Sequence, residues 1–367
     1  MRPLWALGLM SGTSLDGIDA AMVQTDGVRI FAFGESRFRP YQQDEHALLR
    51  RALGAMPDAP GLSEVTACVD MCHSVVAEGF SPDVVGYHGQ TLSHDPSAFH
   101  TFQVGDGTAL SESLGRTVVW DFRTADVLSG GEGAPLVPVF HFAAAKMAEL
   151  EGYVAILNIG GVANVTWLDA GAEVADSPDA LLAFDTGPGN ALINDFMAAR
   201  RDMGMDRDGA LAAEGVPDEG IVARLLTHPY FTKPPPKSLD RDAFRHALDA
   251  LRPLSDADGA ATLTALTAAS IAASTRHMPH PPDRWLITGG GRQNATLMRM
   301  IAAHTNTPVD PVEAVGLDGD MLEAQAFGYL AVRVLRGLPT SLPGTTGARL
   351  AVCGGRVSGV EPKGTGT

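Results

Sequence analysis

The chain opens with Gly8-Leu9-Met10-Ser11-Gly12-Thr13-Ser14-Leu15-Asp16-Gly17-Ile18-Asp19, a polar, glycine-rich turn between two apolar runs. The apolar runs Leu4–Met10 and Ile18–Thr25 have the composition of strands, which predicts an antiparallel hairpin. A turn of Gly, Thr, Ser and Gly lets backbone N–H groups and hydroxyls point at one anion. A hairpin turn without a ligand would use similar residues.

The order of strand, glycine turn and strand recurs in the second half of the chain. Tyr153–Ile159, Gly160-Gly161 and Ala163–Leu168 repeat it, with little residue identity to the first half. Further strand and helix patterns follow in both halves, and Gly259–Thr275 has the composition of a buried helix. We therefore expect an α/β fold with mixed sheets.

The glycine-rich run Ser129–Pro135 predicts a domain boundary or a hinge. We expect an N-terminal lobe over residues 1–132 and a C-terminal lobe over residues 133–350. Residues 351–367 form a tail, rich in Gly and Thr from Gly354, that is expected to be loose and could return to the first lobe.

The composition limits what the chain can bind. It has 367 residues, with 43 acidic and 27 basic side chains and a formal net charge of −16. That charge disfavours extended nucleic acid and anionic membrane surfaces, which both require clustered cations. The chain has only three cysteines, and its sequence shows no pattern of a signal peptide or of a membrane span. We therefore predict a cytoplasmic protein.

A carboxylate and two glycines follow the strand pattern Leu181–Phe184. The segment Asp185-Thr186-Gly187-Pro188-Gly189-Asn190 leads from that strand into the helical pattern Ala191–Arg200. A glycine loop before a helix N-terminus favours phosphate, and an aspartate at a strand end is well placed as a base. The alternative is an aspartate that only caps the helix or the turn.

Three consecutive glycines, Gly289-Gly290-Gly291, follow the buried strand pattern Trp285–Thr288. They permit close approach of a flat or anionic ligand, which a plain strand-to-helix turn does not require. The segment is neither a Walker A motif nor a Rossmann fingerprint, because it lacks the spacing of both. Together, the three glycine turns suit a nucleotide held between two lobes.

The order of these motifs resembles that of the anhydro-N-acetylmuramic acid kinases, within the sugar kinase/Hsp70/actin superfamily. The resemblance rests on the opening segment and on Gly86-Tyr87-His88-Gly89-Gln90-Thr91, Asn158-Ile159-Gly160-Gly161-Val162-Ala163-Asn164, Phe184–Asn190 and Thr288–Asn294. It extends from residue 7 to about residue 350, nearly the whole chain. It implies a two-lobed, ribonuclease H-like α/β fold with mixed sheets and a central nucleotide cleft.

Two segments depart from the pattern of that family. Glu132 stands where the family has glutamine in Gly-Gly-Gln-Gly-Ala-Pro-Leu, and Lys237-Ser238-Leu239-Asp240-Arg241-Asp242 replaces Lys-Ser-Thr-Gly-Arg-Glu. We assign no catalytic role in the second segment, whose lysine is interpreted as only a solvated surface charge.

The resemblance implies an unusual reaction. The substrates would be ATP and 1,6-anhydro-N-acetylmuramic acid, in which O6 is bridged to C1 and has no proton to remove. Water would attack C1 with Asp185 as the base, and the freed O6 would attack the γ-phosphate of ATP. The products would be N-acetylmuramic acid 6-phosphate and ADP, in cell-wall recycling.

The resemblance also implies binding residues. ATP is expected to contact Gly12, Thr13, Ser14, Leu15, Asp16, Gly17, Ile18, Asp19, Gly187, Gly189, Gly289, Gly290 and Gly291. Sugar contacts are expected from His88, Gln90, Thr91, Asp121, Arg123 and Glu323. Mg²⁺ would be held mainly by the phosphates, with Asp16 and Asp19 in outer-shell contact. Family members are also expected to form homodimers.

The residues leave alternatives open. His88 could cap its strand, Arg123 could pair with Asp121 instead of the lactyl carboxylate of the sugar, and Glu323 could serve only the helix dipole. Two rival functions also stay open for the chain. One is a hexokinase-like amino-sugar kinase, in which Asp185 deprotonates a free 6-hydroxyl, and the other is a non-catalytic ATP-dependent sensor or clamp.

Overall fold

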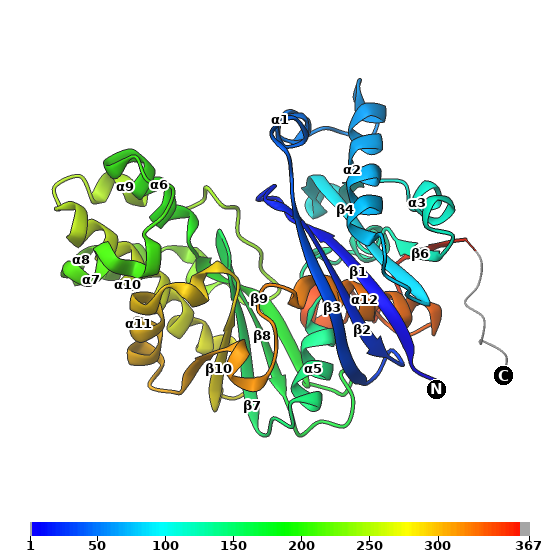
Figure 1. The fold of residues 1–367 in the computed structure, drawn as a ribbon. Coiled ribbons are helices and arrows are strands. Elements are labelled where there is room, and N and C mark those ends of the chain that lie inside the picture. The colour runs from blue at the N-terminus through cyan, green and yellow to red at the C-terminus, as the bar shows by residue number, and fades with distance from the viewer. Residues whose placement is uncertain (1, 360–367) are drawn as a thin grey trace. The chain divides into compact units, whose positions relative to one another are not determined.

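The computed structural model describes residues 2–359, which fold into two compact units whose elements are labelled in Figure 1. Unit 1 consists of Met1–Glu149, Val174–Asp176 and Met321–Thr367, and unit 2 consists of Leu150–Glu173 and Ser177–Asp320. Each unit is built around its own β-sheet.

Unit 1 is a mixed sheet with helices on both faces. Its strands in the described residues are β1 (Leu4–Ser11), β2 (Gly17–Thr25), β3 (Ile30–Pro40), β4 (Val84–Asp95), β5 (His100–Val104), β6 (Thr117–Trp120) and β12 (Arg356–Ser358). Its helices are α1 (Gln43–Ala52), α2 (Leu62–Ala77), α3 (Gly107–Leu114), α4 (Thr124–Leu128), α5 (Pro138–Met147), α12 (Leu322–Leu335) and α13 (Pro343–Thr346), with a 3₁₀ turn η1 (Pro96–Ala98). The strand order is β12-β6-β4-β1-β2-β3, with β5 paired to β4.

Unit 2 is a five-stranded sheet in the order β11-β10-β7-β8-β9. Its strands are β7 (Tyr153–Ile159), β8 (Val162–Asp169), β9 (Leu181–Pro188), β10 (Arg284–Thr288) and β11 (Val309–Pro311). Its helices are α6 (Ala191–Arg201), α7 (Ala210–Glu214), α8 (Glu219–Leu225), α9 (Ala247–Ala250), α10 (Asp256–Ser274) and α11 (Ala295–Thr305). Its 3₁₀ turns are η2 (Arg207–Gly209), η3 (Pro229–Thr232), η4 (Thr275–His277), η5 (Gly290–Gln293) and η6 (Val312–Val315).

The strand directions make both sheets mixed. In unit 1, β1 runs antiparallel to β2 and parallel to β4, and β2 runs antiparallel to β3. In unit 2, β7 runs antiparallel to β8 and parallel to β10, and β8 runs antiparallel to β9. Each unit therefore has three antiparallel strands followed by a parallel strand beside the first. The predicted α/β fold with mixed sheets is confirmed.

Two glycines let α12 lie directly on the sheet of unit 1. Gly8 of β1 is opposite Gly86 of β4. A Cβ on Gly8 would lie 1.6 Å from the carbonyl oxygen of Ala324, and a Cβ on Gly86 would lie 2.0 Å from that of Phe327. Because side chains alternate along a strand, the neighbouring Leu9 faces the opposite side, in the core formed with α2.

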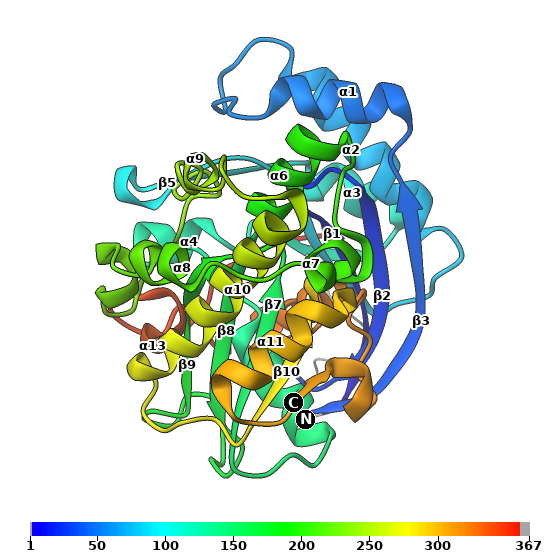
Figure 2. The ribbon, with the colours of Figure 1, turned by 90° about the vertical axis from the view of Figure 1, so that its left-hand side faces the viewer.

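Helix α10 is the centre of unit 2. Its residues Gly259–Ile271 are buried, which confirms the predicted buried helix. Ala268 and Ile271 pack with the sheet, while Ala261 and Leu266 pack with the helices that follow β9. In Figure 2, α10 and α11 lie over one face of this sheet. The small side chains of α10 allow it to contact layers on both sides.

Several bounds differ from the sequence patterns because of strand pairing. Strand β4 continues through the motif Gly86–Thr91 to Asp95, since β5 pairs with its second half. The strand predicted to end at Phe184 continues to Pro188 beside β8. The expectation of a loose tail is wrong for Arg356–Ser358, which pairs with β6, and the tail beyond residue 359 lies outside the described residues.

The glycine-rich run predicted as a boundary or hinge is anchored inside unit 1. The Gly133 N–H donates to the Asp126 carboxylate at 2.7 Å, and the Glu132 N–H donates to the Thr346 carbonyl at 2.7 Å. The compact units divide the chain at 149/150 and 320/321, not at the predicted 132/133 and 350/351. The difference arises because α5 and α12 pack together in unit 1, where the rings of Phe140 and Tyr329 lie 5.8 Å apart.

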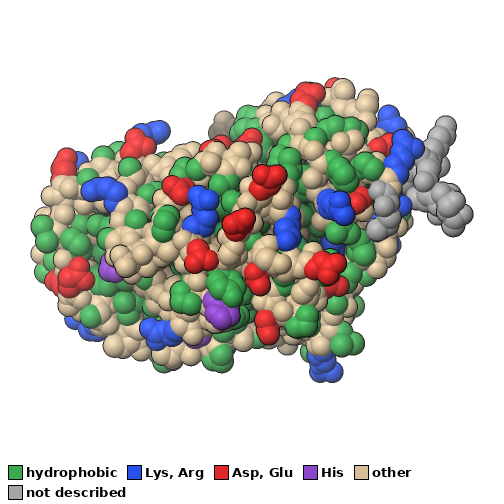
Figure 3. Space-filling model, turned by 90° about the horizontal axis from the view of Figure 1, so that it is seen from below, with side chains coloured by type: hydrophobic (Ala, Val, Ile, Leu, Met, Phe, Trp, Pro, Cys, Tyr) green, Lys and Arg blue, Asp and Glu red, His purple; other side chains and the backbone are tan. Residues whose placement is uncertain are grey.

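The surface shows no gathering of cations on the face in Figure 3, where lysine and arginine side chains lie mostly singly among acidic ones. Across residues 2–359, no helix combines the length and the apolar character needed to cross a bilayer. The cytoplasmic location stays a prediction.

We expect Gly8→Ala to destabilise the protein by about 3 kcal/mol, because the new methyl would overlap a helix backbone that cannot rotate away. Gly204→Ala is the matched control, since a Cβ there would meet nothing within 4 Å, and its effect should stay within about 0.5 kcal/mol. Differential scanning calorimetry measures both. Equal Tm values for the two variants would contradict the role given to Gly8.

Candidate active site

The turn between β1 and β2 presents polar groups to solvent. Thr13, Ser14 and Asp16 are exposed, whereas Leu15 has a left-handed backbone with φ 59° and a side chain in the hydrophobic core. The Leu15 N–H donates to the Gly12 carbonyl at 3.2 Å. The buried leucine therefore anchors a turn that displays two hydroxyls and one carboxylate.

Gln90 holds this turn in place through its side-chain hydrogen bonds. Its side chain is fully buried, its carbonyl oxygen accepts the Ser11 hydroxyl at 2.6 Å, and its amide donates to the Gly12 carbonyl at 3.2 Å. Thr91, its neighbour, accepts a hydrogen bond from the Gln103 amide. The structure thus places Gln90 against the turn of the hairpin, and sugar contacts from Gln90 and Thr91 stay predictions.

Strand β3 packs against the residues that follow the turn and pairs with them. A Cβ on Gly17 would lie 2.4 Å from the carbonyl oxygen of Arg39. Ile18 is fully buried in the core, so that only its backbone could reach a ligand. Asp19 is half-buried in β2, opposite Phe38 of β3.

His88 and Arg123 form a hydrogen-bonded pair in unit 1. The His88 Nε2 accepts from the Arg123 Nε at 3.1 Å and Nη2 at 3.0 Å, while the Nδ1–H donates to the Gly89 carbonyl at 2.8 Å. Arg123 also donates to the Gly133 carbonyl at 2.8 Å. Burial, together with the Arg123 charge, lowers the pKa of His88 well below its usual value. His88 is therefore a neutral acceptor that orients the guanidinium.

Helix α12 completes this cluster. The Phe327 ring lies 4.6 Å from the His88 ring, and Glu323 in the first turn of α12 is exposed. Burial lowers the pKa of Arg123 to about 10, and the Glu323 charge opposes that shift. Asp121 instead accepts a hydrogen bond from Thr124, and no ion pair joins Asp121 to Arg123 among the residues described. The structure thus brings His88, Arg123 and Glu323 together and leaves Asp121 apart.

Asp185 lies within β9 and is held by a loop 50 residues further along the chain. The Leu239 N–H donates to its carboxylate at 2.8 Å, and its own N–H donates to the Lys237 carbonyl at 3.1 Å. Its carbonyl accepts the Tyr230 hydroxyl at 2.7 Å. The alternative of a helix cap is wrong, since Asn190 occupies the N-cap position of α6.

Gly187 and Gly189 are required by close packing. A Cβ on Gly189 would lie 2.5 Å from the Gly160 carbonyl oxygen, and a Cβ on Gly187 would lie 2.6 Å from the Ser270 hydroxyl. The Gly189 N–H donates to the Gly161 carbonyl at 3.0 Å. Packing therefore explains both glycines, and their contact with ATP stays a prediction.

Gly289–Gly291 follows β10 at the edge where the parallel strand β7 also ends. Gly289 has φ 72°, and a Cβ there would lie 2.2 Å from Asn158. Gly290 is exposed, whereas Gly291 packs on Ile159. The carboxyl ends of parallel strands are a common place for ligands. The turn Gly160-Gly161 and the segment Gly289–Gly291 meet there.

Three other residues support these segments and were not among the predicted site residues. Arg292 donates to the Gly289 carbonyl at 3.0 Å and pairs with Glu313 at 2.8 Å. The Asn190 amide donates to the Ile159 carbonyl at 3.0 Å. The third is Lys237, for which the prediction of a solvated surface charge is wrong.

Lys237 is only 3% exposed, whereas Lys233 in the same loop is exposed. The Lys237 ammonium donates to the Tyr230 carbonyl at 3.2 Å and lies 4.7 Å from the Tyr230 ring centre. A lysine after three prolines has no periodic pattern around it, so no signal in the sequence indicated this burial.

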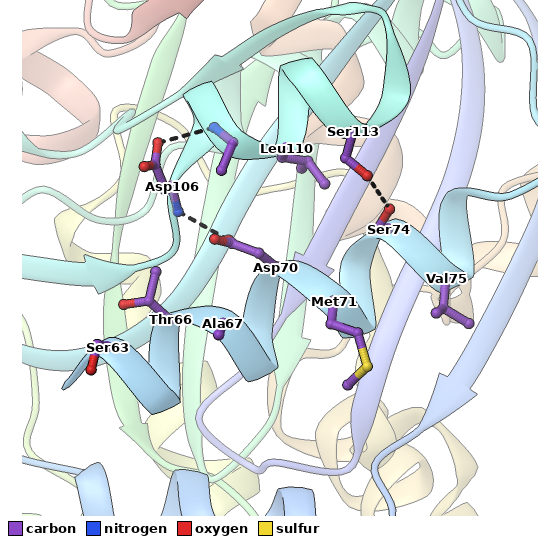
Figure 4. A pocket seen from close by; sticks show the side chains of 11 residues that line it. Ser63, Thr66, Ala67, Asp70, Met71, Ser74, Val75, Asp106, Leu110 and Ser113 are labelled. Atoms are coloured by element: carbon purple, nitrogen blue, oxygen red, sulfur yellow. Dashed lines mark hydrogen bonds between the residues drawn. The ribbon is translucent and has the colours of Figure 1, made fainter. Parts of the chain in front are cut away.

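A groove of about 680 Å³ lies between α2 and α3 in unit 1, as Figure 4 shows. Asp70 on α2 accepts the Asp106 N–H there at 2.9 Å, and Ser74 bonds Ser113 at 2.9 Å. Met71 and Val75 add exposed apolar surface. None of the predicted site residues lines this groove.

The fixed carboxylate on β9 and the glycine turns at strand ends are the features that a phosphotransferase of the sugar-kinase class requires. Comparisons with known proteins specify the family.

Residues 4–358 match the family model described as anhydro-N-acetylmuramic acid kinase. The chain is 55% identical over 359 residues to the anhydro-N-acetylmuramic acid kinase of Cereibacter sphaeroides, covering 98% of this chain and 97% of that one. It is 51% identical over 360 residues to the protein of that name from Rhodospirillum rubrum, covering 96% and 93%. The chain belongs to the anhydro-N-acetylmuramic acid kinase family, which confirms the resemblance and the prediction of a phosphotransferase.

Solved structures give weaker similarity. A ROK family glucokinase from Streptomyces griseus in complex with glucose and AMPPNP has a TM-score of 0.39 and 14% identity, covering 89% of this chain and 99% of that chain.

We expect the neutral His88 to make stability depend on pH. Its pKa in the folded chain lies below the value of about 6.5 in an unfolded chain, so the unfolded state takes up a proton first as pH falls. The stability that His88 contributes is complete above about pH 6.5 and decreases below it by up to about 1.4 kcal/mol per pH unit.

Thermal unfolding between about pH 7 and pH 5 measures this effect. The decrease in Tm should be smaller in His88→Gln, whose amide oxygen can accept from Arg123 without titrating. The buried His73 and His141, with pKa values lowered by burial to about 4 and about 3, contribute equally in both proteins. Equal decreases in the two proteins would contradict the neutral state of His88.

Proposed function

We propose that this protein uses ATP to convert 1,6-anhydro-N-acetylmuramic acid into N-acetylmuramic acid 6-phosphate, with release of ADP, in cell-wall recycling. Membership of the family and the names of its relatives support the substrate. The observation that carries the chemistry is the carboxylate of Asp185, which is half-buried and fixed by the Leu239 N–H at 2.8 Å.

The substrate explains why one base suffices. Its O6 is bonded to C1 and carries no proton. Asp185 takes a proton from water as the water oxygen bonds to C1, and the electrons of the broken C1–O6 bond pass to O6. O6 then bonds to the γ-phosphorus while the bond from phosphorus to ADP breaks, so the leaving oxygen requires no separate acid.

The surroundings of Asp185 support its role as a base. A carboxylate that accepts a backbone N–H is stabilised in its ionised form, which is the form that can remove a proton. The backbone of Asp185 is also held on both sides, by the Lys237 carbonyl and by the Tyr230 hydroxyl. The carboxylate is therefore positioned before the substrate binds, which lowers the entropic cost of the reaction.

The hairpin turn of unit 1 supports binding of ATP phosphates. Thr13 and Ser14 offer exposed hydroxyls and backbone N–H groups, and Asp16 offers an exposed carboxylate. No group of three or more His, Cys, Asp or Glu that could hold a metal occurs among residues 2–359. The exposed Asp16 carboxylate of this turn fits Mg²⁺ held mainly by phosphates, with Asp16 and Asp19 in outer-shell contact. When bound, Mg²⁺ supplies charge neutralisation at the phosphates.

Arg123 is the residue that we propose for the lactyl carboxylate of the sugar. Its hydrogen-bond partners, the His88 ring and the Gly133 carbonyl, are both neutral and hold the guanidinium in place. A guanidinium oriented in this way suits a carboxylate. The homodimer that the family implies stays a prediction.

We expect Asp185→Asn to reduce turnover by at least about 10³-fold, because the amide cannot accept a proton from water. Binding of ATP should change little, since the substitution preserves shape. ADP release with the anhydro sugar measures turnover, and isothermal titration calorimetry measures ATP binding. Turnover within tenfold of wild type would remove Asp185 as the base.

Turnover in ¹⁸O-water distinguishes the proposal from a hexokinase-like reaction on a free 6-hydroxyl. We expect one ¹⁸O atom at C1 of the product, by mass spectrometry of early time points, because water opens the anhydro bond. The sugar hemiacetal exchanges this oxygen slowly, so unlabelled product incubated in ¹⁸O-water is the control. Phosphorylation of an open sugar without label at C1 would overturn the proposal.

A further inference from the structure

Three hydrogen bonds form a closed ring around the backbone of Asp185. The Asp185 N–H donates to the Lys237 carbonyl at 3.1 Å, and the Lys237 ammonium donates to the Tyr230 carbonyl at 3.2 Å. The Tyr230 hydroxyl donates to the Asp185 carbonyl at 2.7 Å. The loop of Lys237 also supplies the Leu239 N–H that holds the carboxylate. The ring therefore connects the buried lysine to the atom that would act as the base.

The Lys237 ammonium is held almost entirely by neutral groups. It lies between the rings of Tyr230 and Phe184, at 4.7 and 5.5 Å from their centres. The His277 Nε2 is 3.4 Å away, but its N–H donates to the Phe231 carbonyl at 3.0 Å, so it accepts no bond from the ammonium. His277 is neutral near pH 7, because burial lowers its pKa. Removing an ammonium from water is costly unless a negative charge compensates it.

The charged groups around Lys237 identify that negative charge. Burial, with Arg276 and then Lys233, lowers the pKa of Lys237 to about 8, and Asp185 opposes the shift. Lys237 is therefore still mostly protonated near pH 7. Asp185 is the carboxylate that stabilises it, and the stabilisation must be mutual.

We propose that Lys237 is a positioning residue for Asp185, which closes the hydrogen-bonded ring that fixes the carboxylate and favours its ionised form through its positive charge. The proposal rests on the proposed function, because it assigns Lys237 a part in the same reaction. It also explains why Lys237 is buried.

Amide hydrogen exchange tests the ring without any substrate. In Lys237→Met, the amides of Asp185 and Leu239 should exchange about tenfold faster, as expected for the loss of a hydrogen bond, while those of β7 stay unchanged. Tyr230→Phe should accelerate the same amides and keeps the charge of Lys237. Unchanged exchange at both amides in a folded variant would overturn the proposal.

The pH dependence of turnover tests the charge. Without the ammonium, the ionised form of Asp185 is less favoured, so the acid limb of kcat/KM should move up by about one pH unit in Lys237→Met. We expect kcat to fall at least tenfold with KM for ATP within twofold. Lys237→Arg should return the acid limb to its wild-type position. Tyr230→Phe should lower kcat without moving the acid limb. An unmoved acid limb in Lys237→Met would overturn the proposal.

Lys233→Met is the matched control, because it removes an exposed lysine from the same loop and should behave as wild type. If Lys237→Met does not fold, as judged by circular dichroism, Lys237→Gln replaces it in both measurements and Tyr230→Phe still reports on the ring. If the wild-type protein does not turn over the anhydro sugar, the proposed function is wrong. The hydrogen-exchange measurement still tests the hydrogen-bonded ring in that case.

Discussion

The contact between α12 and the sheet is the constraint on which unit 1 depends. Gly8 and Gly86 lie opposite each other on adjacent parallel strands, and the absence of a Cβ at both lets the backbone of α12 rest on the sheet. This contact places the Phe327 ring 4.6 Å from His88, which in turn orients Arg123. A helix more than 200 residues away in sequence therefore sets the direction of the guanidinium proposed to bind the sugar.

Close packing also accounts for much of the glycine in unit 2. Gly189, Gly289 and Gly291 each lie where a Cβ would overlap a neighbouring turn or strand. These contacts bring the ends of β7, β9 and β10 to the places from which ligands are usually bound in α/β proteins. Glycine, which the sequence suggests for phosphate binding, is therefore required at these positions by the packing of the fold. The exposed Gly290 is the member of its run that packing does not explain.

Much of the fold follows from local patterns, whereas the support of the site does not. Apolar periodicity and glycine turns predict the mixed sheets and the buried α10. The burial of Lys237 and the inward-facing Gln90 depend on contacts between distant segments, such as the bond from Leu239 to Asp185 across 54 residues. A short pattern around Lys237 carries no information about such a contact, so it resembles a solvated charge. The predicted strand Leu181–Phe184 was too short for a different reason, because its extension to Pro188 depends on pairing with the neighbouring strand β8.

Each unit holds one cation with neutral partners at its candidate site. Arg123 donates to the His88 ring and to a carbonyl, and Lys237 donates to a carbonyl between two aromatic rings. Neutral partners orient a cation, and the burial that accompanies them is unfavourable, while the charges of Glu323 and Asp185 act against that cost. The lowered pKa values of Arg123 and Lys237 express this cost. Such an arrangement is stabilised by any carboxylate brought close to it. The anionic sugar proposed as the substrate would therefore not require a basic surface on a chain with a net charge of −16, because individual cations are oriented locally.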